Sequence, residues 1–321
     1  MAGPRIAFVA GDPNGIGPEL AAKLLARPGN VAAAEIVVFA DPAVLAAGER
    51  VAQVRALVGN GGAALRALDA GAGAITPGQA TEAGGRAALS ALNAAAEAAL
   101  RGEVDGIVFA PLNKHALRLA GMSHEDELRM LQERFGVRGF VSEFNITGDL
   151  WTSRVTSHVP LRDVADAITA EGVVQAVEIV HRYLVAAGRP VPRVAVTGLN
   201  PHAGDGGSIG REEIDVIAPA IERARMQGID ARGPLSSDTV FVAARRGDYD
   251  AVVTMYHDQG QIAMKLMGFE QGVTLHGGLP VPIATCASGT AFDIVGKNVA
   301  SVEGLQHAFD LAVAIASRKA G

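Results

Sequence analysis

Three histidines stand in separate segments of this chain that are punctuated by glycine or proline. His158 occurs in TSHVPLRD, His202 in GLNPHAGDGG and His257 in MYHDQGQIAMK. Neutral imidazoles that converge from separate strand ends can bind a divalent metal ion. Their wide spacing excludes a finger-type site, whose ligands lie a few residues apart. A single histidine is more often a capping or core residue, but three at successive strand-to-loop junctions favour a metal site.

Two glycine-rich turns are further candidates for contact with a small ligand. In GDPNGIGPE the amide groups of a helix N-terminus can hold an anion, yet Asp12 and Glu19 would repel a phosphate. This segment is therefore either a tight turn or a polar wall of a site. The second turn, GTAFDIVGKN, offers Gly289, Thr290 and Asp293 before a predicted helix. Neither turn is a GxGxxG dinucleotide fingerprint.

The composition restricts the class of protein. The chain has 321 residues, 49% hydrophobic and 19% charged, which suits a globular protein of two α/β lobes. A net charge of −6 and 4% aromatic residues argue against a nucleic-acid partner. No apolar run is long enough for a signal peptide or a membrane span, so we expect no membrane partner and a cytoplasmic location. The one cysteine, Cys286, is expected to be buried.

Strands and helices alternate along the chain. Short β-branched runs predict strands, and longer runs with apolar residues at helical spacing predict crossover helices, as in a mostly parallel sheet. Each histidine follows such a strand, where open parallel sheets bind their ligands. Residues 59–78 are predicted to be a surface connection or an edge element. The strand-bearing segments are 5–11, 35–41, 104–117, 153–160, 192–204 and 249–260, and the main helices are 81–103, 172–188 and 212–228.

Seven long segments, in order, resemble the 4-hydroxythreonine-4-phosphate dehydrogenase family. They are GDPNGIGPEL, APLNKHAL, TSHVPLRDV, GLNPHAGDGGSIGREEIDVIAPAI, GPLSSDTVF, YDAVVTMYHDQGQIAMKLMGF and SGTAFDIVGK, and they cover nearly the whole chain. The resemblance implies a two-lobed α/β fold like that of isocitrate and isopropylmalate dehydrogenases, with mostly parallel sheets flanked by helices and an active site in the interdomain cleft. It implies a cofactor-side domain of residues 1–125 plus 275–321, and a metal-binding and dimerisation domain of residues 126–274.

The resemblance also implies the ligands. In that family the histidines matching His158, His202 and His257 bind a divalent metal at a dimer interface, with ligands drawn from both subunits. We therefore expect an obligate homodimer with shared active sites that binds Zn, Co, Ni, Mn or Mg. The second glycine-rich turn resembles an adenosine-binding loop and implies NAD or NADP as cofactor. The cofactor-binding candidates are Gly289, Thr290, Ala291, Asp293 and Asp12.

These residues predict the oxidation of a small hydroxy acid. A metal ion bound by neutral imidazoles makes a substrate hydroxyl more acidic and so favours hydride transfer to the nicotinamide. A β-hydroxy acid would then lose carbon dioxide. Asp238 and Asp258 are the candidate proton acceptors or orienters of the histidines. Lys265 is expected to hold the substrate carboxylate or to supply a proton, and Lys114 is a second candidate cation. The alternative for these two aspartates and two lysines is that each forms an ordinary ion pair without a catalytic role.

One loop departs from the family pattern GVNxTxGLPxIRTSxDHGTA. This chain has GVTLHGGLPVPIATCASGTA, in which Thr274 replaces the Asn and Ile283 replaces the Arg. The family's GHTE segment, which helps to hold the substrate phosphate, corresponds loosely to SHEDE at His124. Loss of a bidentate arginine weakens a phosphate site. A related branch of the family, the terephthalate cis-dihydrodiol dehydrogenases, also lacks that Arg, and in this respect the chain resembles it. The resemblance implies an unphosphorylated substrate, such as a terephthalate cis-dihydrodiol, whose apolar body we expect to lie against Val281, Ile283 and Met264.

Other functions stay open at this point. The chain could be a genuine dehydrogenase of 4-phosphooxy-threonine, or of 4-phospho-threonate or erythronate. From another class of enzyme, a zinc hydrolase or lyase could use the same histidines with a bound hydroxide. A binding protein that has lost its catalytic activity is the third alternative.

Overall fold

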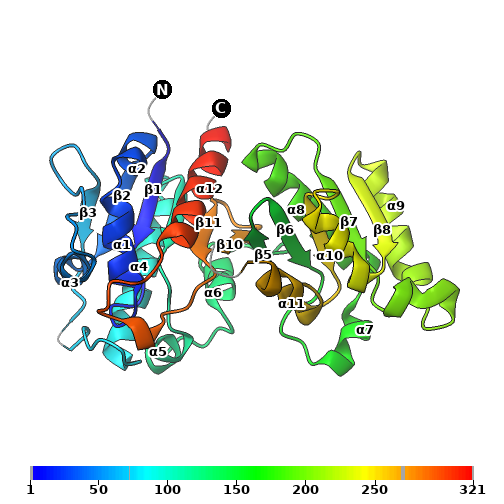
Figure 1. Cartoon of the computed structure of the whole chain (residues 1–321), viewed down its shortest axis with the longest axis horizontal. Helices are drawn as coiled ribbons and strands as arrows, with labels where there is room; N and C mark the ends of the chain where they lie inside the picture. The colour runs from blue at the N-terminus through cyan, green and yellow to red at the C-terminus, as the bar shows by residue number, and fades with distance from the viewer. Residues whose placement is uncertain (1–2, 72, 269–271, 320–321) are drawn as a thin grey trace. The chain divides into compact units, whose positions relative to one another are not determined.

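The computed structural model describes residues 3–71, 73–268 and 272–319 of the chain. Two compact units make up the chain. Unit 1 comprises Met1–Arg138, Val273–Leu275 and Leu279–Gly321, and unit 2 comprises Gly139–Gly272 and His276–Gly278. Each unit is an α/β structure whose strands are flanked by helices (Figure 1).

In unit 1, β3, β2, β1, β4 and β11 are neighbours in this order, and each neighbouring pair is parallel. Strand β10 follows β11 in the strand order. The central strands are continuous apolar runs because helices cover both faces of the sheet, and Phe8, Ile36 and Ile107 are at most 1% exposed. The strands are β1 (Arg5–Val9), β2 (Glu35–Ala40), β3 (Ala64–Ala67), β4 (Gly106–Phe109) and β11 (Ile283–Cys286), and β10 (Val273–Gly277) begins in unit 1 and ends in unit 2.

The helices of unit 1 start at clear sequence signals. Thr81 and Asn113 each accept a backbone N–H with their side-chain oxygen, which caps α4 and α5. Helix α4 packs on β1, β2 and β4, and α12 packs on β4 and β11. The helices are α1 (Gly17–Leu25), α2 (Pro28–Ala33), α3 (Pro42–Ala52), α4 (Glu82–Leu100), α5 (Lys114–Leu119), α6 (Glu127–Arg134), the 3-10 turn η5 (Phe292–Ile294) and α12 (Glu303–Lys319).

The strands of unit 2 have the order β5-β6-β9-β7-β8. Strands β5 and β6 form an antiparallel hairpin, and β6, β9, β7 and β8 are parallel. The strands are β5 (Ser142–Thr147), β6 (Leu150–Arg154), β7 (Arg193–Thr197), β8 (Asp230–Leu235) and β9 (Ala251–Thr254). The helices are η1 (Leu161–Asp163), α7 (Val164–Ala167), α8 (Ala170–Ala187), η2 (Pro201–Gly207), the π-helix η3 (Glu213–Ile217), α9 (Ala218–Met226), α10 (Ser237–Arg245) and α11 (His257–Gly268).

Three adjacent strands of unit 2 lead to the three histidines. His158 follows β6, His202 follows β7 and His257 is the first residue of α11 after β9. Because β6, β9 and β7 are neighbours and parallel, their carboxyl ends lie at one edge of the sheet. The arrangement is the one expected for ligand binding at the carboxyl edge of an open α/β sheet.

The predicted fold class is confirmed. The strands predicted before each histidine are β6, β7 and β9, and the region 59–78 contains the edge strand β3. Cys286 is 5% exposed, as expected for a small apolar side chain. Among the described residues, no helix has both the length and the apolar character that a membrane span requires.

Candidate active site

The rings of His158 and His257 lie close together at the carboxyl edge of unit 2. Their centroids are 5.4 Å apart and their planes are inclined by 37°. His158 is exposed and His257 is partly exposed, so both rings are accessible. The backbone of His158 has a φ of 44°, a left-handed conformation that costs a non-glycine residue about 1–2 kcal/mol. Strain of this kind is typical of residues whose side chain has a functional position.

A carboxylate already orients one of these imidazoles. The Nδ1 atom of His257 lies 2.7 Å from the Oδ1 atom of Asp258. When Nδ1 carries the proton, Nε2 of the neutral ring has a free lone pair for a metal ion. A histidine whose second nitrogen is bound by a carboxylate is the usual arrangement of metal-binding imidazoles.

His202 lies in an unusual backbone segment. His202, Ala203 and Asp205 have φ values of 53°, 54° and 44°, and the glycines 204 and 206 among them are also left-handed. The His202 side chain is exposed. In the described part of one chain, the ligand atoms of the three histidines do not all lie within 4.8 Å of one another. One chain therefore places the rings of His158 and His257 close together, but in its described part it does not gather all three histidines into one group of ligands.

Asp238 lies in the first turn of α10, close enough to His202 for their charges to interact. The hydroxyl of Ser236 donates to its Oδ1 atom at 2.6 Å. This hydrogen bond, aided by backbone N–H groups and by the charge of His202, lowers the pKa of Asp238 below its usual value. The side chain is thus a carboxylate at neutral pH.

The side chain of Gln259 connects the strand ends from which two of the histidines follow. Its Oε1 atom accepts from the Met255 amide at 2.7 Å and from the Thr197 hydroxyl at 2.8 Å. Its Nε2 atom donates to the Gly198 carbonyl at 2.8 Å. The first turn of α11, which bears His257, is thereby fixed against the ends of β7 and β9.

The two candidate lysines lie on different units. Lys265 is exposed on α11, about 12 Å along the helix axis from His257 at 1.5 Å per residue. Lys114 is exposed at the start of α5 in unit 1, next to the capping residue Asn113.

The structure brings the two glycine-rich turns of unit 1 together. The carbonyl of Thr290 accepts from the Ile16 amide at 3.0 Å, and its hydroxyl accepts from the Asn113 side chain at 3.2 Å. A Cβ atom on Gly15 would lie 2.7 Å from the Thr290 Cβ, so only glycine permits this approach. The pair forms one loop cluster at the carboxyl ends of β1 and β4.

Asp12 is the buried acid of this cluster. It is 1% exposed, and its Oδ1 atom accepts from the Asn14 amide at 2.8 Å. No described residue donates to its Oδ2 atom. Burial raises the pKa of Asp12, and the bond from Asn14 offsets part of this effect. Of the other cofactor candidates, Gly289 and Asp293 are exposed and Ala291 has a φ of 43°.

The structure gives little support to the expected contacts with an unphosphorylated substrate. Ile283 is 0% exposed in β11, and Met264 is 3% exposed within the core of unit 2. Two of the three side chains expected against an apolar substrate body are therefore used for packing. The imidazole of His124 lies 2.7 Å from the Glu133 carboxylate of α6, while Thr274 is partly exposed in β10.

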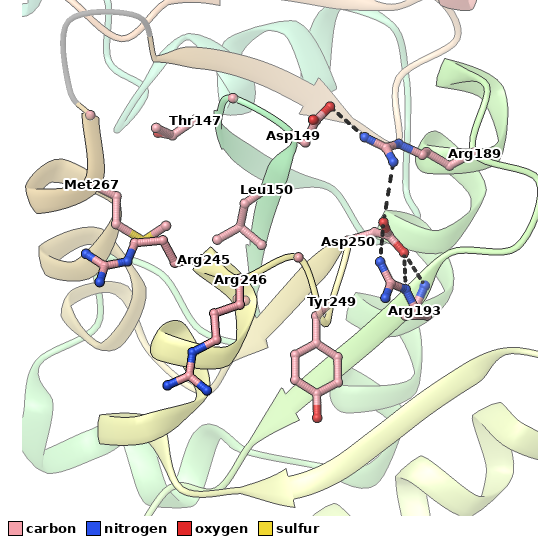
Figure 2. Close-up of a pocket in the computed structure, with 14 residues that line it drawn as sticks. Thr147, Asp149, Leu150, Arg189, Arg193, Arg245, Arg246, Tyr249, Asp250 and Met267 are labelled. Carbon is pink, nitrogen blue, oxygen red and sulfur yellow. Dashed lines mark hydrogen bonds and ion pairs between the residues drawn. The ribbon is translucent and has the colours of Figure 1, made fainter.

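A cavity of about 820 Å³ lies elsewhere on unit 2, near the amino ends of β6, β7 and β9 (Figure 2). Its walls include Arg189, Arg193, Arg245, Arg246 and Tyr249. Ion pairs with aspartates hold Arg189 and Arg193, as the dashed lines in Figure 2 mark. The cavity has none of the three histidines in its lining, so its position argues against a role in their chemistry.

Sequence reasoning missed three residues that organise these loops: Asn113, Gln259 and Glu213. Gln259 stands two residues after His257, and Asn113 precedes a helix, a position where Asn is a frequent cap. Glu213 follows a glycine-rich segment and gave no signal of its own, because its role depends on tertiary contacts with the segment that precedes it.

Several known proteins that are similar to this chain come from one family of dehydrogenases. The family model described as "Pyridoxal phosphate biosynthetic protein PdxA" matches residues 32–312. A Pseudomonas aeruginosa protein, provisionally named 4-hydroxythreonine-4-phosphate dehydrogenase 2, is 48% identical, and the alignment covers 99% of this chain and 98% of that protein. A crystal structure of 4-hydroxythreonine-4-phosphate dehydrogenase from Klebsiella pneumoniae is 34% identical with a TM-score of 0.83 and covers 98% of both chains.

Two further solved structures bear on the substrate and on the fold. A terephthalate 1,2-cis-dihydrodiol dehydrogenase from Burkholderia xenovorans is 30% identical with a TM-score of 0.70, covering 97% of this chain and 98% of that one. A β-decarboxylating dehydrogenase from Thermococcus kodakarensis, 14% identical with a TM-score of 0.54 over 96% and 82%, shares the fold. From the family match and these relatives together, the chain belongs to the PdxA family of 4-hydroxythreonine-4-phosphate dehydrogenases.

Proposed function

We propose that this protein is a metal-dependent dehydrogenase that oxidises a phosphorylated β-hydroxy acid with NAD or NADP. The main support for this proposal is that His158, His202 and His257 each follow one of three adjacent parallel strands. Membership of a dehydrogenase family supports the reaction type. The cluster of Asp12, Thr290 and Asn113 in unit 1 is the proposed contact region for the nicotinamide cofactor.

The proposed metal ligands suit a divalent ion. The contact of His257 Nδ1 with Asp258 leaves Nε2 of His257 as a neutral donor, and the neighbouring ring of His158 is accessible. Imidazole ligands accept zinc, cobalt, nickel and iron ions, so the ligand set does not select one of them. When bound, such an ion supplies a positive charge that makes a coordinated hydroxyl more acidic.

The remaining residues have roles that follow from their positions. Asp258 orients the His257 ring and keeps its Nε2 atom directed away from the carboxylate. Asp238, which is ionised and close to His202, accepts the proton of the substrate hydroxyl. Lys265, two helical turns from His257, binds the substrate carboxylate and returns a proton to the carbon from which carbon dioxide leaves. Lys114 is the proposed second cation.

The phosphorylated substrate replaces the unphosphorylated one that the sequence favoured. Relatives named for 4-hydroxythreonine-4-phosphate reach 48% identity, whereas the cis-dihydrodiol dehydrogenase is 30% identical. The apolar substrate wall has little support, because Ile283 and Met264 are buried. Similarity over the whole chain therefore supports 4-hydroxythreonine 4-phosphate or a closely related phosphorylated hydroxy acid more strongly than a cyclic diol.

We further propose that the active enzyme is a homodimer with shared sites. The reason is that one chain, in its described part, does not assemble all three histidines into a single group of ligands. A second copy of the chain would supply the missing imidazole, as homodimers with an isologous interface can do.

A steady-state assay tests this function. The metal-free protein is loaded with Co²⁺ or Zn²⁺, and formation of NADH or NADPH is followed with 4-hydroxythreonine 4-phosphate, 4-hydroxythreonine and terephthalate cis-dihydrodiol. We expect kcat/KM to be on the order of 100-fold higher for the phosphorylated compound, since a site built for a charged group rejects its neutral analogue. His158→Ala should abolish turnover, while the exposed His307→Ala serves as control. Equal turnover of all three substrates would refute the substrate assignment.

A further inference from the structure

The backbone, rather than contacts of its side chain, sets the position of His202. Its imidazole is exposed and makes no hydrogen bond with the described part of the chain. The residues from His202 to Gly206 all have left-handed backbone conformations. Three of them are not glycines, and the left-handed conformation is unfavourable for each of these three. Other contacts must hold the segment in place.

A single buried carboxylate, that of Glu213, lies at the centre of these contacts. Glu213 is 2% exposed. Its Oε1 atom accepts from the backbone amides of Leu199 at 2.8 Å and Asn200 at 2.7 Å. Its Oε2 atom accepts from the side-chain amide of Asn200 at 3.0 Å. Burial acts to raise the pKa of Glu213, but these hydrogen bonds prevail and lower it below the usual value.

The loop also approaches this carboxylate with two glycines. A Cβ atom on Gly204 would lie 2.6 Å from Oε2 of Glu213, and one on Gly198 would lie 2.9 Å from Oε1. Any larger residue would displace the carboxylate or the loop. The segment from the end of β7 to Gly204, which includes His202, therefore wraps around the Glu213 side chain.

We infer that Glu213 is a positioning residue for His202, holding through its carboxylate the left-handed segment that presents the imidazole. The inference rests on the proposed function, in which His202 is a metal ligand. An ionised carboxylate accepts from all three donors and presents no hydrogen to any of them. A glutamine of the same shape carries an NH₂ group in place of one oxygen, which would oppose an N–H donor.

Glu213 could instead act only by stabilising the helix on which it lies, and this alternative predicts a different result. Glu213 begins the π-helix η3, where a negative charge stabilises the helix N-terminus. Asp215 lies on the same π-helix, is 51% exposed and pairs with Arg211 at 2.8 Å. Asp215→Asn removes the same charge from the same helix without touching the loop, so it is the matched control.

Titration of the metal-free protein with Co²⁺ tests the inference, followed by the visible absorption of the bound ion. We expect Glu213→Gln to weaken Co²⁺ binding about 10–100-fold and to alter the absorption spectrum, because a displaced imidazole changes the ligand field. Asp215→Asn should bind like the wild type. Asn200→Ala removes the side-chain donor, which also bonds Glu212 at 2.7 Å, but keeps both backbone donors to Glu213 and should give a smaller loss. Thermal melting of each metal-free variant checks folding, and Asn200→Ala decides the test if Glu213→Gln does not fold.

A double variant separates positioning from general destabilisation. In the His202→Ala background, Glu213→Gln should cause no further loss of Co²⁺ affinity, since the imidazole that it positions is absent. Normal Co²⁺ binding by Glu213→Gln would overturn the inference, and Asn200→Ala takes its place if Glu213→Gln does not fold. An equal loss of Co²⁺ affinity on Glu213→Gln in the wild-type and His202→Ala backgrounds would also overturn it. If wild type and His202→Ala bind Co²⁺ equally well, the proposed function itself fails, and that result is distinct from the others.

Discussion

At the scale of single residues, the contact between His257 and Asp258 has the clearest chemical consequence. Asp258 is 72% exposed and adjacent to His257 in sequence, so it contributes little to packing. Its contact with Nδ1 of His257 nevertheless selects the tautomer in which Nε2 can bind a metal ion. A change at Asp258 should therefore alter ligation and leave folding intact.

We expect Asp258→Asn to weaken Co²⁺ binding about 10–100-fold, because an amide orients the imidazole without increasing its basicity. The free energy of unfolding should change by less than about 0.5 kcal/mol, as for other exposed substitutions. Metal titration and urea unfolding measure the two quantities. Asp166→Asn, an exposed aspartate on α7, is the control. Unchanged metal affinity would show that Asp258 does not orient a ligand.

At the scale of secondary structure, the ion pair between Arg193 and Asp250 connects the amino ends of β7 and β9. Asp250, just before β9, accepts from the amide of Arg193 at 2.8 Å and from its Nε and Nη2 atoms at 3.1 and 3.2 Å. The Asp250 amide donates to the Arg193 carbonyl in return. Since β7 and β9 are adjacent, this pair sets the register of the strands that lead to His202 and His257.

This pair predicts a pH dependence of stability. Burial acts to raise the pKa of Asp250, but the hydrogen bonds and charge of Arg193, with the charge of Arg189, lower it below the usual value. A depressed folded-state pKa contributes stability above the unfolded pKa near 4, and this stability is lost as the pH falls through the folded value. Asp250→Asn should thus lower the free energy of unfolding by about 1.5–3 kcal/mol near pH 7.

Urea unfolding across the acid range measures the effect. The difference between wild type and Asp250→Asn should be largest at neutral pH and should shrink as the pH falls through the lowered pKa of Asp250, where its carboxyl becomes uncharged. Asp149→Asn, which changes a 93% exposed partner of Arg189, should shift stability much less. A constant difference at every pH would contradict an electrostatic origin.

The strands and helices of this chain were largely predictable, whereas the conformation of its loops was not. Runs such as the one in β9, Ala251–Thr254, are β-branched and buried on both faces, which gives a strong signal. Nothing in Ala203 or Asp205 indicates a positive φ, because neither residue type requires one. Likewise the alignment of Ile283 with an arginine identified a difference but could not show that the side chain is buried in β11.

At the scale of the whole molecule, the positions of the histidines predict cooperation between two copies of the chain. His158 and His257 are neighbours within one chain, while the three histidines together do not form one group of ligands there. If each site takes His202 and His257 from different subunits, the two substitutions His202→Ala and His257→Ala should complement each other. A heterodimer of the two variants then has one site lacking both ligands and one site with all three.

Co-refolding equal amounts of the two inactive variants tests this arrangement. Random association gives heterodimers as about half of all dimers, each with one intact site, so activity should return to about one quarter of the wild-type value. Each variant refolded alone should stay inactive. As a control, the His202→Ala variant is mixed with a double variant that carries both His202→Ala and Asp258→Asn. This mixture should regain no activity, because neither chain supplies His202. If the two single variants likewise regain no activity although heterodimers form, each subunit must provide His202 and His257 to the same site.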